Sequence, residues 1–466
     1  MQAKTIYTIC VLVCLAAFEH IVVGLFPPLF SIISSELNIG ISQMGFVSGI
    51  TIIVTSFSAV LWGAIGGKFN SKVLLILGTG IWVLSVFATS YVQSFSQLLL
   101  CQFFTGIGLG CISSIGFSVL TDSISVERRG MILSFWGMSQ GFGGIIGAIV
   151  ASIIGTSISW RTPFSILGVI GLILLICYLF IEVPSVGKSE PELKPLLDKG
   201  GIYDHKFTFS HIQEVAFKKS NVFLFLQALF VNITIGSLIW VPTLYISKIE
   251  GLGFPSKTAI IAASFLYGIF QIGGLTSTYF GHIGDQIQRK TLKGRAIFTG
   301  CVLFLMIPFY FLLFSLPMKN LELPTDHNSI WILWMLLKQF FFNQWMFLLL
   351  VISFIASAVQ SANTPNWLAI ITDVNLPEHR GVVFSLGNLM NSIGRTVGNV
   401  GVGLLLPLFS NYFNQQESYI YTLSTLLLFI IPASLCYLFM AKRNVEDIKD
   451  VKYILSERVK KLRAND

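Results

Sequence analysis

The chain has 466 residues, of which 54% are hydrophobic and only 11% are charged, and its formal net charge is +8. Soluble proteins carry about a quarter charged residues, so this composition excludes a soluble globular protein and predicts a membrane protein that crosses the bilayer repeatedly. The seven cysteines all fall within apolar segments, which argues against a disulfide framework or a metal site.

Twelve segments are long and apolar enough to cross a bilayer, which requires about 20 mostly apolar residues. They are residues 6–34, 42–66, 73–92, 95–122, 130–156, 161–182, 222–247, 257–282, 295–316, 344–372, 381–408 and 416–440. The first segment is longer than the apolar core of a signal peptide, and no small-residue cleavage site follows it. We therefore interpret it as a spanning helix.

One long polar interruption divides these spans into six plus six. We predict an N-terminal six-helix bundle (1–183), a cytoplasmic linker (184–221), a C-terminal six-helix bundle (222–441) and a basic cytoplasmic tail (442–466). The linker contains Ser210-His-Ile-Gln213, a pattern typical of a helix start. Apolar residues at helical spacing in the tail predict an amphipathic helix, which either lies against anionic headgroups or is solvated.

The positions of lysine and arginine predict the orientation of the chain. Most of these 30 residues lie at the N-terminus, in the turns after spans 2, 4, 8 and 10, in the linker and in the tail. Positive charge concentrates on the cytoplasmic side of membrane proteins, so both termini are expected in the cytoplasm, with the protein in the cell membrane. Residues 317–343 then form a long outer loop.

Two motifs occur once in each half. Gly63–Lys72 resembles Gly281–Lys290, and Thr121–Gly130 shares the pattern T-D-x4-E-x-R-G with Thr372–Gly381, at an offset of 251. At the same offset, the second match continues through the pairs Ser134 and Ser385, Gln140 and Asn391, Gly143 and Gly394, and Gly147 and Gly398. Such repetition predicts two equivalent structural halves.

Twelve spans in two halves, with G-x-x-G-D-x-x-x-R-K after span 8 and E-x-R-G before span 11, resemble the major facilitator superfamily. Lys68–Lys72, Trp160–Phe164 and the Glu182-Val-Pro ending of span 6 resemble its spinster-like branch of lipid transporters. The resemblance implies an all-α membrane protein with two pseudo-symmetric six-helix bundles. It also implies a secondary transporter that works by alternating access, with no enzymatic activity, cofactor or metal.

Glu19 and His20 lie in the middle of span 1. A charge at this depth costs about 2.5–3.5 kcal/mol on insertion scales, so it normally faces a cavity or a partner. Adjacent helical residues point about 100° apart, so at most one of the two is expected to face a central cleft directly. Either Glu19 binds a proton or a cationic group, with His20 as a relay, or both satisfy neighbouring helices.

Arg395 lies halfway along span 11, on one helix face with Asn388 and Asn391. An arginine at this depth needs an anionic headgroup, a carboxylate such as that of Glu19, or several carbonyl groups. It is therefore either a substrate-binding residue or part of a structural ion pair. Three further polar residues at membrane depth are candidates for substrate binding or gating, with interhelical hydrogen bonding as the alternative: Asn232, Gln360 and Asn363.

The resemblance also implies a cytoplasmic gate made of charged residues at helix ends. The candidates are Asp285, Arg289, Gly281 and Gly284 of the basic turn, with Asp122, Arg129, Asp373 and Arg380. Asp285 is expected to meet the start of span 5, where helix N–H groups favour an acid. The equivalent position in the first half is Gly67, so a single acidic latch is predicted.

The coupling mechanism and the substrate stay open. Gln102 and Leu109 stand where relatives carry charges, and Phe142 stands where antiporters carry a proline. One acid, one arginine and several amides suit a zwitterionic or amphipathic molecule, so we expect a lysolipid or lipid-like solute, with protons as a candidate coupling ion. The alternatives are a proton-coupled drug antiporter and a non-transporting sensor. We expect a monomer in the lipid bilayer, with no nucleic-acid partner.

Overall fold

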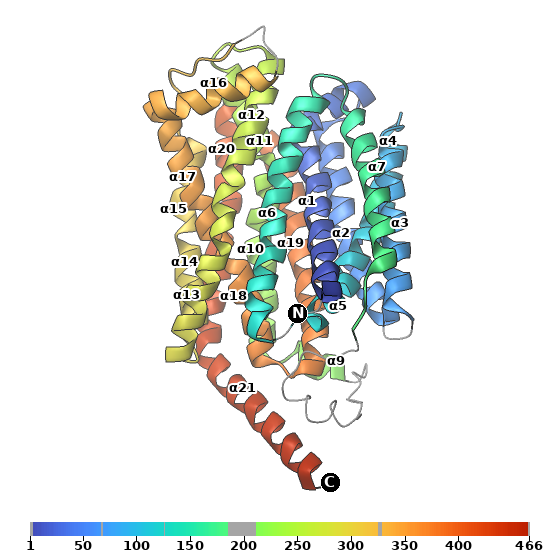
Figure 1. Cartoon of the computed structure of the whole chain (residues 1–466). Coiled ribbons are helices and arrows are strands. Elements are labelled where there is room, and N and C mark those ends of the chain that lie inside the picture. Colours follow the sequence, from blue (N-terminus) through green and yellow to red (C-terminus); the bar gives the residue numbers. More distant parts are fainter. Residues whose placement is uncertain (1–2, 67–68, 125, 185–210, 325–328, 465–466) are drawn as a thin grey trace.

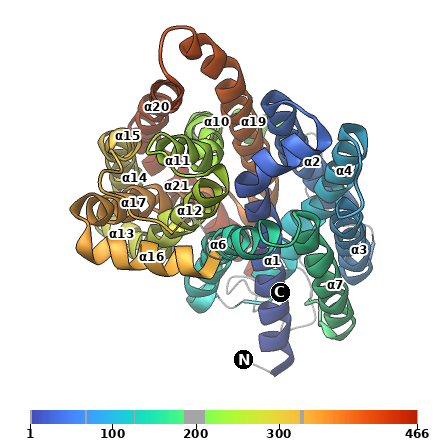
Figure 2. The ribbon, with the colours of Figure 1, turned by 90° about the horizontal axis from the view of Figure 1, so that it is seen from above.

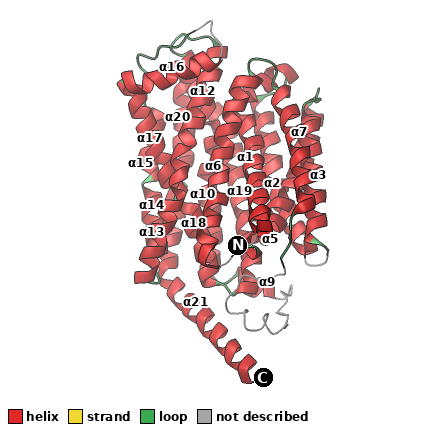
Figure 3. Ribbon diagram, viewed as in Figure 1, coloured by secondary structure: helices red, strands yellow, loops and turns green. Residues whose placement is uncertain are grey.

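The computed structural model describes residues 3–66, 69–124, 126–184, 211–324 and 329–464. These residues form helices and connecting loops and contain no strand (Figure 3). Twelve helical segments among them are long and apolar enough to cross a membrane. The predicted class is confirmed: the chain is a multi-pass membrane protein.

The six spans of the first half follow the predicted segments closely. They are α1 (Ala3–Leu37), α2 (Ile41–Gly66), α3 (Ser71–Thr89), α4 (Phe95–Cys111) continued by η1 (Ile112–Gly116) and α5 (Phe117–Asp122), α6 (Val126–Val150) with η2 (Ala151–Gly155), and α7 (Arg161–Cys177) with η3 (Tyr178–Phe180).

The second half begins with a short linker helix and then contains six more spans, several of them broken into segments. Its helices are α9 (His211–Ala216), α10 (Lys219–Ser237), η4 (Leu238–Trp240), α11 (Val241–Glu250), α12 (Ser256–Phe270), η5 (Gln271–Thr276), α13 (Ser277–Lys290), α14 (Gly294–Phe304), α15 (Met306–Ser315), α16 (Ser329–Phe342), α17 (Gln344–Ser361), α18 (Asn363–Val374), α19 (Pro377–Ser410), α20 (Gln415–Leu427) and α21 (Ile430–Ala464).

Each half has its own apolar core. One cluster of buried residues comes from positions 9–181 and the other from positions 215–448. Seen from above, the two groups of helices lie side by side, with α1, α2, α6 and α19 near the boundary (Figure 2). Contacts across this boundary join α2 to α19 and α6 to α12, so these helices form the walls between the halves.

The sequence duplication is visible in the way the helices pack. In both halves, glycines let the fifth span approach the carbonyl groups of the first span closely. A Cβ added to the glycine would lie near a carbonyl oxygen in these four contacts: Gly143 and Ala17 (2.4 Å), Gly147 and Ile21 (2.3 Å), Gly394 and Leu229 (2.3 Å), Gly398 and Ile233 (1.9 Å). The carbonyl partners are 212 positions apart both times (229 − 17 and 233 − 21). The predicted equivalence of the halves is confirmed.

Two elements differ from the expectation. The outer loop contains a helix, α16, which lies across the end of the bundle opposite the chain termini (Figure 1). We call the end with both termini and α9 the lower face, and the end with α16 the upper face. The tail is not a separate helix, because α21 continues from the last span to Ala464 with proline only in its first turn. Ile448 and Val451 of this extension are buried.

The predicted start of the linker helix falls partly outside the described residues. α9 begins at His211, and Ser210 precedes the described range. The beginning of α10 is held to the tail by Lys218, whose Nζ lies 3.6 Å from Asp447 Oδ1 and donates to the Val374 carbonyl at 2.5 Å. The linker, span 10 and the tail therefore meet at the lower face.

Candidate functional site

Two sets of contacts join the halves toward the upper face. The rings of Phe30 in α1 and Trp240 in η4 lie 5.9 Å apart. Trp240 Nε1 donates to Asn399 Oδ1 at 2.7 Å, and Asn399 Nδ2 donates to the Gly45 carbonyl at 3.0 Å. This hydrogen-bonded aromatic contact joins α19 of the second half to α2 of the first.

An aromatic cluster joins the halves nearer the lower face. Phe117 of α5 and Phe384 of α19 stack with ring centroids 4.6 Å apart and an interplanar angle of 14°. Trp136 of α6 contacts Phe117 at 6.0 Å, and Trp367 of α18 contacts Phe384 at 6.2 Å. The sequence contains 40 phenylalanines and 9 tryptophans, so nothing in the pattern singled out these four rings.

Along α19, Arg395 lies between the contacts made by Phe384 and those made by Asn399. The residue is exposed, although α10 packs closely against its backbone at Gly236. Its Nε donates to Asn232 Oδ1 of α10 at 2.9 Å. Within the described part of the chain, this is the one hydrogen bond of the guanidinium, and no carboxylate lies within ion-pair distance of it. Its two terminal nitrogens are therefore available to an anionic group.

The amides beside Arg395 form a connected row. Asn232 Nδ2 donates to Asn391 Oδ1 at 2.6 Å, and Asn391 Nδ2 donates to Asn388 Oδ1 at 3.2 Å. The predicted common face of Asn388, Asn391 and Arg395 is thus observed, with Asn232 joining it from the neighbouring span. The row fixes the direction of the guanidinium, because Asn232 holds its Nε.

Glu19 and His20 are half-buried in the middle of α1. His20 Nδ1 lies 2.9 Å from the Ala16 carbonyl, so Nδ1 carries a hydrogen and Nε2 is the free ring atom. Glu19 of α1 and Arg395 of α19 belong to different halves, and they form no ion pair among the described contacts. An acid in one half and an arginine in the other therefore lie at membrane depth.

The repeat explains how the two walls differ. The offset of 212 pairs His20 with Asn232 and Gly24 with Gly236, and the offset of 251 pairs Gly144 with Arg395. A Cβ added to Gly24 would lie 2.8 Å from the Gly144 oxygen, and one added to Gly236 would lie 2.2 Å from the Arg395 oxygen. The backbones match, while one half has glycine where the other has arginine.

Gln360 and Asn363 are bonded elsewhere in the second half. Gln360 Oε1 accepts a hydrogen bond from the Tyr310 hydroxyl. Asn363 Oδ1 accepts from Gln227 Nε2 at 3.0 Å and from the Tyr437 hydroxyl at 2.8 Å. These bonds belong to the packing of spans 7, 9, 10 and 12, so a direct role of Gln360 and Asn363 in substrate binding stays a prediction.

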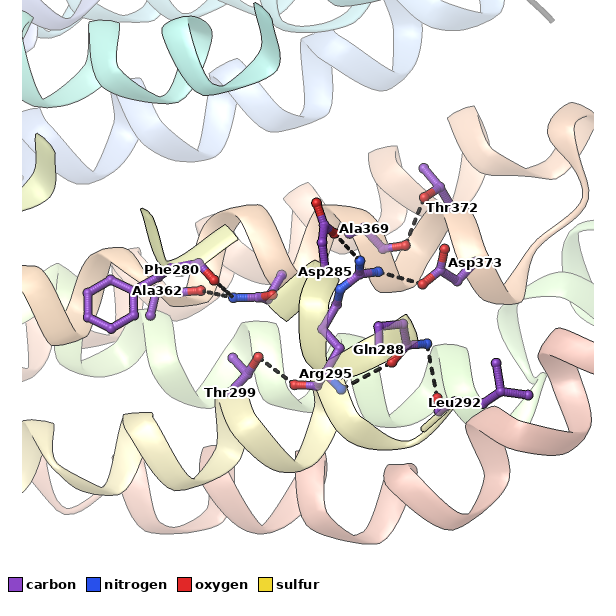
Figure 4. A network of polar contacts seen from close by, with 11 residues as sticks. Phe280, Asp285, Gln288, Leu292, Arg295, Thr299, Ala362, Ala369, Thr372 and Asp373 are labelled. Carbon is purple, nitrogen blue, oxygen red and sulfur yellow. Dashed lines mark hydrogen bonds and ion pairs between the residues drawn. The ribbon is translucent and has the colours of Figure 1, made fainter. Parts of the chain in front are cut away.

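A second polar cluster lies at the lower face and is centred on Arg295 (Figure 4). The guanidinium of Arg295, at the start of α14, binds Asp285 of α13 and Asp373 of α18. Arg295 is only 7% exposed, against 53% for Asp285 and 32% for Asp373. Its backbone N–H also donates to Gln288 Oε1 at 3.1 Å. This buried cation joins the ends of three helices, and no sequence pattern distinguished it from the other basic residues of the turn.

The structure describes the surroundings of the other gate candidates except Arg129. Gly281 and Gly284 let α13 pack against α18, because a Cβ on Gly284 would lie 1.8 Å from Asn366 Oδ1. Arg289 is exposed, whereas Asp122 and Arg380 are half-buried. The side chain of Arg129 and those at the start of α6 lie outside the described residues. The expected contact of Asp285 with span 5 therefore stays a prediction.

Two equivalent six-span halves that contact each other toward both faces, with polar residues between, define the architecture. The chain belongs to the Major Facilitator Superfamily, whose family model matches residues 12–338. Spinster homolog 1 of Xenopus tropicalis is 25% identical over 179 residues, which cover 37% of this chain and 34% of that protein. The multidrug resistance protein MdtL of Vibrio parahaemolyticus is 22% identical over 160 residues, 34% of this chain and 40% of that protein.

The matched stretches thus span less than half the length of either relative. Among solved structures, the chain resembles a bacterial homolog of the human lysosomal transporter Spinster in its inward-facing, occupied conformation. The TM-score is 0.68 at 17% identity, and the alignment covers 96% of this chain and 99% of the other. The predicted major facilitator fold and the resemblance to spinster proteins are confirmed.

Proposed function

We propose that the protein is a secondary transporter that moves a small amphipathic molecule with a zwitterionic headgroup, such as a lysophospholipid, by alternating access. The observation that carries this proposal is the pair of opposite charges on opposite walls, Glu19 on α1 and Arg395 on α19. Unpaired charges inside a membrane protein are costly. A zwitterion that places its cation near Glu19 and its anion near Arg395 compensates both.

The surroundings of the two charges support an amphipathic solute. The contacts between the halves above and below the two residues are mostly aromatic: the Phe30–Trp240 contact and the Phe117–Phe384 stack. Apolar walls accommodate an acyl chain, and the row of amides beside Arg395 supplies hydrogen bonds to the headgroup. The resemblance to spinster proteins favours the same substrate class. In this proposal the lower face is cytoplasmic, and both termini lie there.

Glu19 and His20 are also the candidates for proton coupling, because they are the titratable pair on the wall opposite Arg395. The likeness to a multidrug resistance protein keeps a proton-coupled antiporter as the alternative. A non-transporting sensor would share the binding site and lack flux. These alternatives predict different outcomes in binding and transport assays.

Ligand-dependent thermal stabilisation of the protein in nanodiscs tests the binding site. The panel is a set of single-chain amphiphiles of equal chain length with zwitterionic, anionic, cationic and neutral headgroups. A ligand at 100 times its Kd stabilises the folded state by about 2.7 kcal/mol. We expect the largest shift in melting temperature with the zwitterionic member.

Charge-neutralising variants test which residue binds the cationic group of the headgroup and which binds the anionic group. Glu19→Gln is expected to reduce the shift from the cationic and zwitterionic members, and Arg395→Gln that from the anionic and zwitterionic members. Glu182→Gln, which removes an exposed ion pair with Lys4, is the matched control and leaves all shifts unchanged. Equal shifts for all four headgroups in the wild type would refute zwitterion recognition.

A further inference from the structure

The helix α16 at the upper face is apolar on both of its sides, and the transport proposal does not involve it. We propose that α16 binds the boundary between lipid headgroups and acyl chains, as a lateral helix seated in the membrane surface. Its 14 residues contain a single charge, that of Lys338. At 1.5 Å per residue it is about 21 Å long, which is too short to cross a hydrocarbon layer about 30 Å thick.

The inward side of α16 packs on the protein. Ser329, Ile332, Leu336 and Phe340 follow one another at helical spacing and are between 0% and 4% exposed. They lie against α12 and α17 of the second half. This face has the apolar partner that an amphipathic helix requires.

The outward side is also apolar, and it is exposed. Ile330 is 61% exposed, Trp334 59% and Phe341 84%. These residues recur at i, i+4 and i+11, so they form one stripe along the helix. A helix whose outer side faces water carries polar residues there. The stripe therefore requires a second apolar partner, and its aromatic residues are of the kind that collects where a bilayer meets water.

The position of α16 identifies this partner as the bilayer that the twelve spans cross. Phe342 ends α16 and Gln344 begins α17, so the end of α16 lies where a span leaves the membrane. At the other end, Ser329 Oγ lies 3.1 Å from Ser157 Oγ and donates to the Ser152 carbonyl of η2 at 3.3 Å. Figure 1 shows α16 running across the upper end of the second-half helices.

Lys338 fits the same placement. Its Nζ lies 5.8 Å from the centre of the Phe342 ring. A lysine near a membrane surface keeps its carbon chain along apolar groups and extends its ammonium to the headgroups. The single charge of α16 thus lies on its exposed part, beside an aromatic ring that the proposal places among the lipids.

Quenching of tryptophan fluorescence by lipid tests the proposal. Wild-type protein and Trp334→Phe are reconstituted in phosphatidylcholine vesicles with or without bromine atoms at a shallow acyl position. The emission lost in the variant is the Trp334 component. Trp82, which is 0% exposed inside the first half, gives the matched component through Trp82→Phe. We expect brominated lipid to reduce the Trp334 component at least twofold and the Trp82 component much less.

Equal, weak quenching of the two components would overturn the proposal. Acrylamide, a water-soluble quencher, then identifies the true environment. Strong acrylamide quenching would show that α16 faces water, and protection from both quenchers would show that a second protein copy covers it. Phenylalanine keeps an apolar aromatic residue in the stripe, so the Trp334→Phe variant is expected to fold as the wild type does.

Discussion

Arg395 and Gly144 hold equivalent positions in two halves that share a backbone arrangement. One half therefore carries a charge at this position and the other half does not. Asn232, the counterpart of His20, orients that charge through the Nε of Arg395. The polar centre is therefore asymmetric although the fold around it is repeated, and the asymmetry is what a zwitterion requires.

The geometry of Arg395 predicts that lysine cannot replace it. With Nε held by Asn232, the two terminal nitrogens form a planar fork for an anion, which an ammonium lacks. A hydrogen bond to a charged group contributes about 1.5–3 kcal/mol, and 1.4 kcal/mol is about tenfold in affinity. Arg395→Lys should weaken binding of the zwitterionic amphiphile about tenfold or more and that of a neutral one less than twofold, as measured by titration calorimetry. Equal losses would indicate a structural role.

Glu19 carries the prediction on proton coupling. If its carboxylate binds the coupling proton, Glu19→Gln abolishes uptake driven by a pH gradient and spares exchange of internal for external substrate. Glu182→Gln is the matched control, because it neutralises an exposed carboxylate outside the polar centre. A flux through Glu19→Gln that still responds to the gradient would exclude this carboxylate as the coupling site.

Much of the candidate site was predictable at this scale, since Glu19, His20 and Arg395 each interrupt an apolar segment. Their partners were not predictable. The bond from Asn232 to Asn391 depends on the register between α10 and α19, which hydropathy does not encode. Gln360 looked equally suitable in the sequence, yet it bonds to Tyr310.

At the scale of elements, Arg295 fastens α13, α14 and α18 at the lower face. Both carboxylates remain partly exposed to solvent, so each ion pair adds only modestly to folding stability. The buried guanidinium needs both carboxylates to compensate its charge. The basic turn of α13 was identified from its motif. Arg295, the main partner of this turn, was not predicted, because in the sequence it looks like any other basic residue of a cytoplasmic loop. The helix α13 also contacts α6 of the other half, which keeps the predicted latch at Asp285 testable.

Two variants of this cluster distinguish two roles of Asp285. One role is a gating contact between the halves, and the other is an ion pair that only stabilises the second half. Asp285→Asn and Asp373→Asn each remove one partner of Arg295 and are expected to lower stability by about 1 kcal/mol, as for partly exposed pairs. If Asp285 is also the latch, only Asp285→Asn increases the labelling of a cysteine placed in the lower part of the space between the halves. Unchanged labelling in both variants would show that Asp285 only stabilises the second half through its ion pair with Arg295.

The helices themselves illustrate what hydropathy can predict. Each spanning segment was identifiable because its length and apolar content match the membrane. The helix α16 was assigned to a loop because 14 residues are too few to cross the bilayer, although they suffice for a lateral helix. The extension of α21 was predicted as helical, and its continuity with the last span follows from the absence of a helix-breaking residue between them.

At the scale of the whole molecule, the two halves meet at both faces. The Trp240–Asn399–Gly45 contacts hold the upper side, and the stack of Phe117 on Phe384 holds the lower side. Rocking of one half against the other would break one set at a time and expose the polar centre to alternate sides. The duplication, read from paired motifs, made this architecture predictable, while the identity of the closing residues required the structure.

Flux through the purified protein tests the central claim most directly. Proteoliposomes loaded with an unlabelled zwitterionic single-chain phospholipid are given a trace of the radiolabelled molecule outside. We predict that wild-type protein accumulates label transiently by exchange, at least tenfold above protein-free vesicles and above Arg395→Gln. Specific binding of the same molecule without any exchange would contradict transport and identify the protein as a sensor.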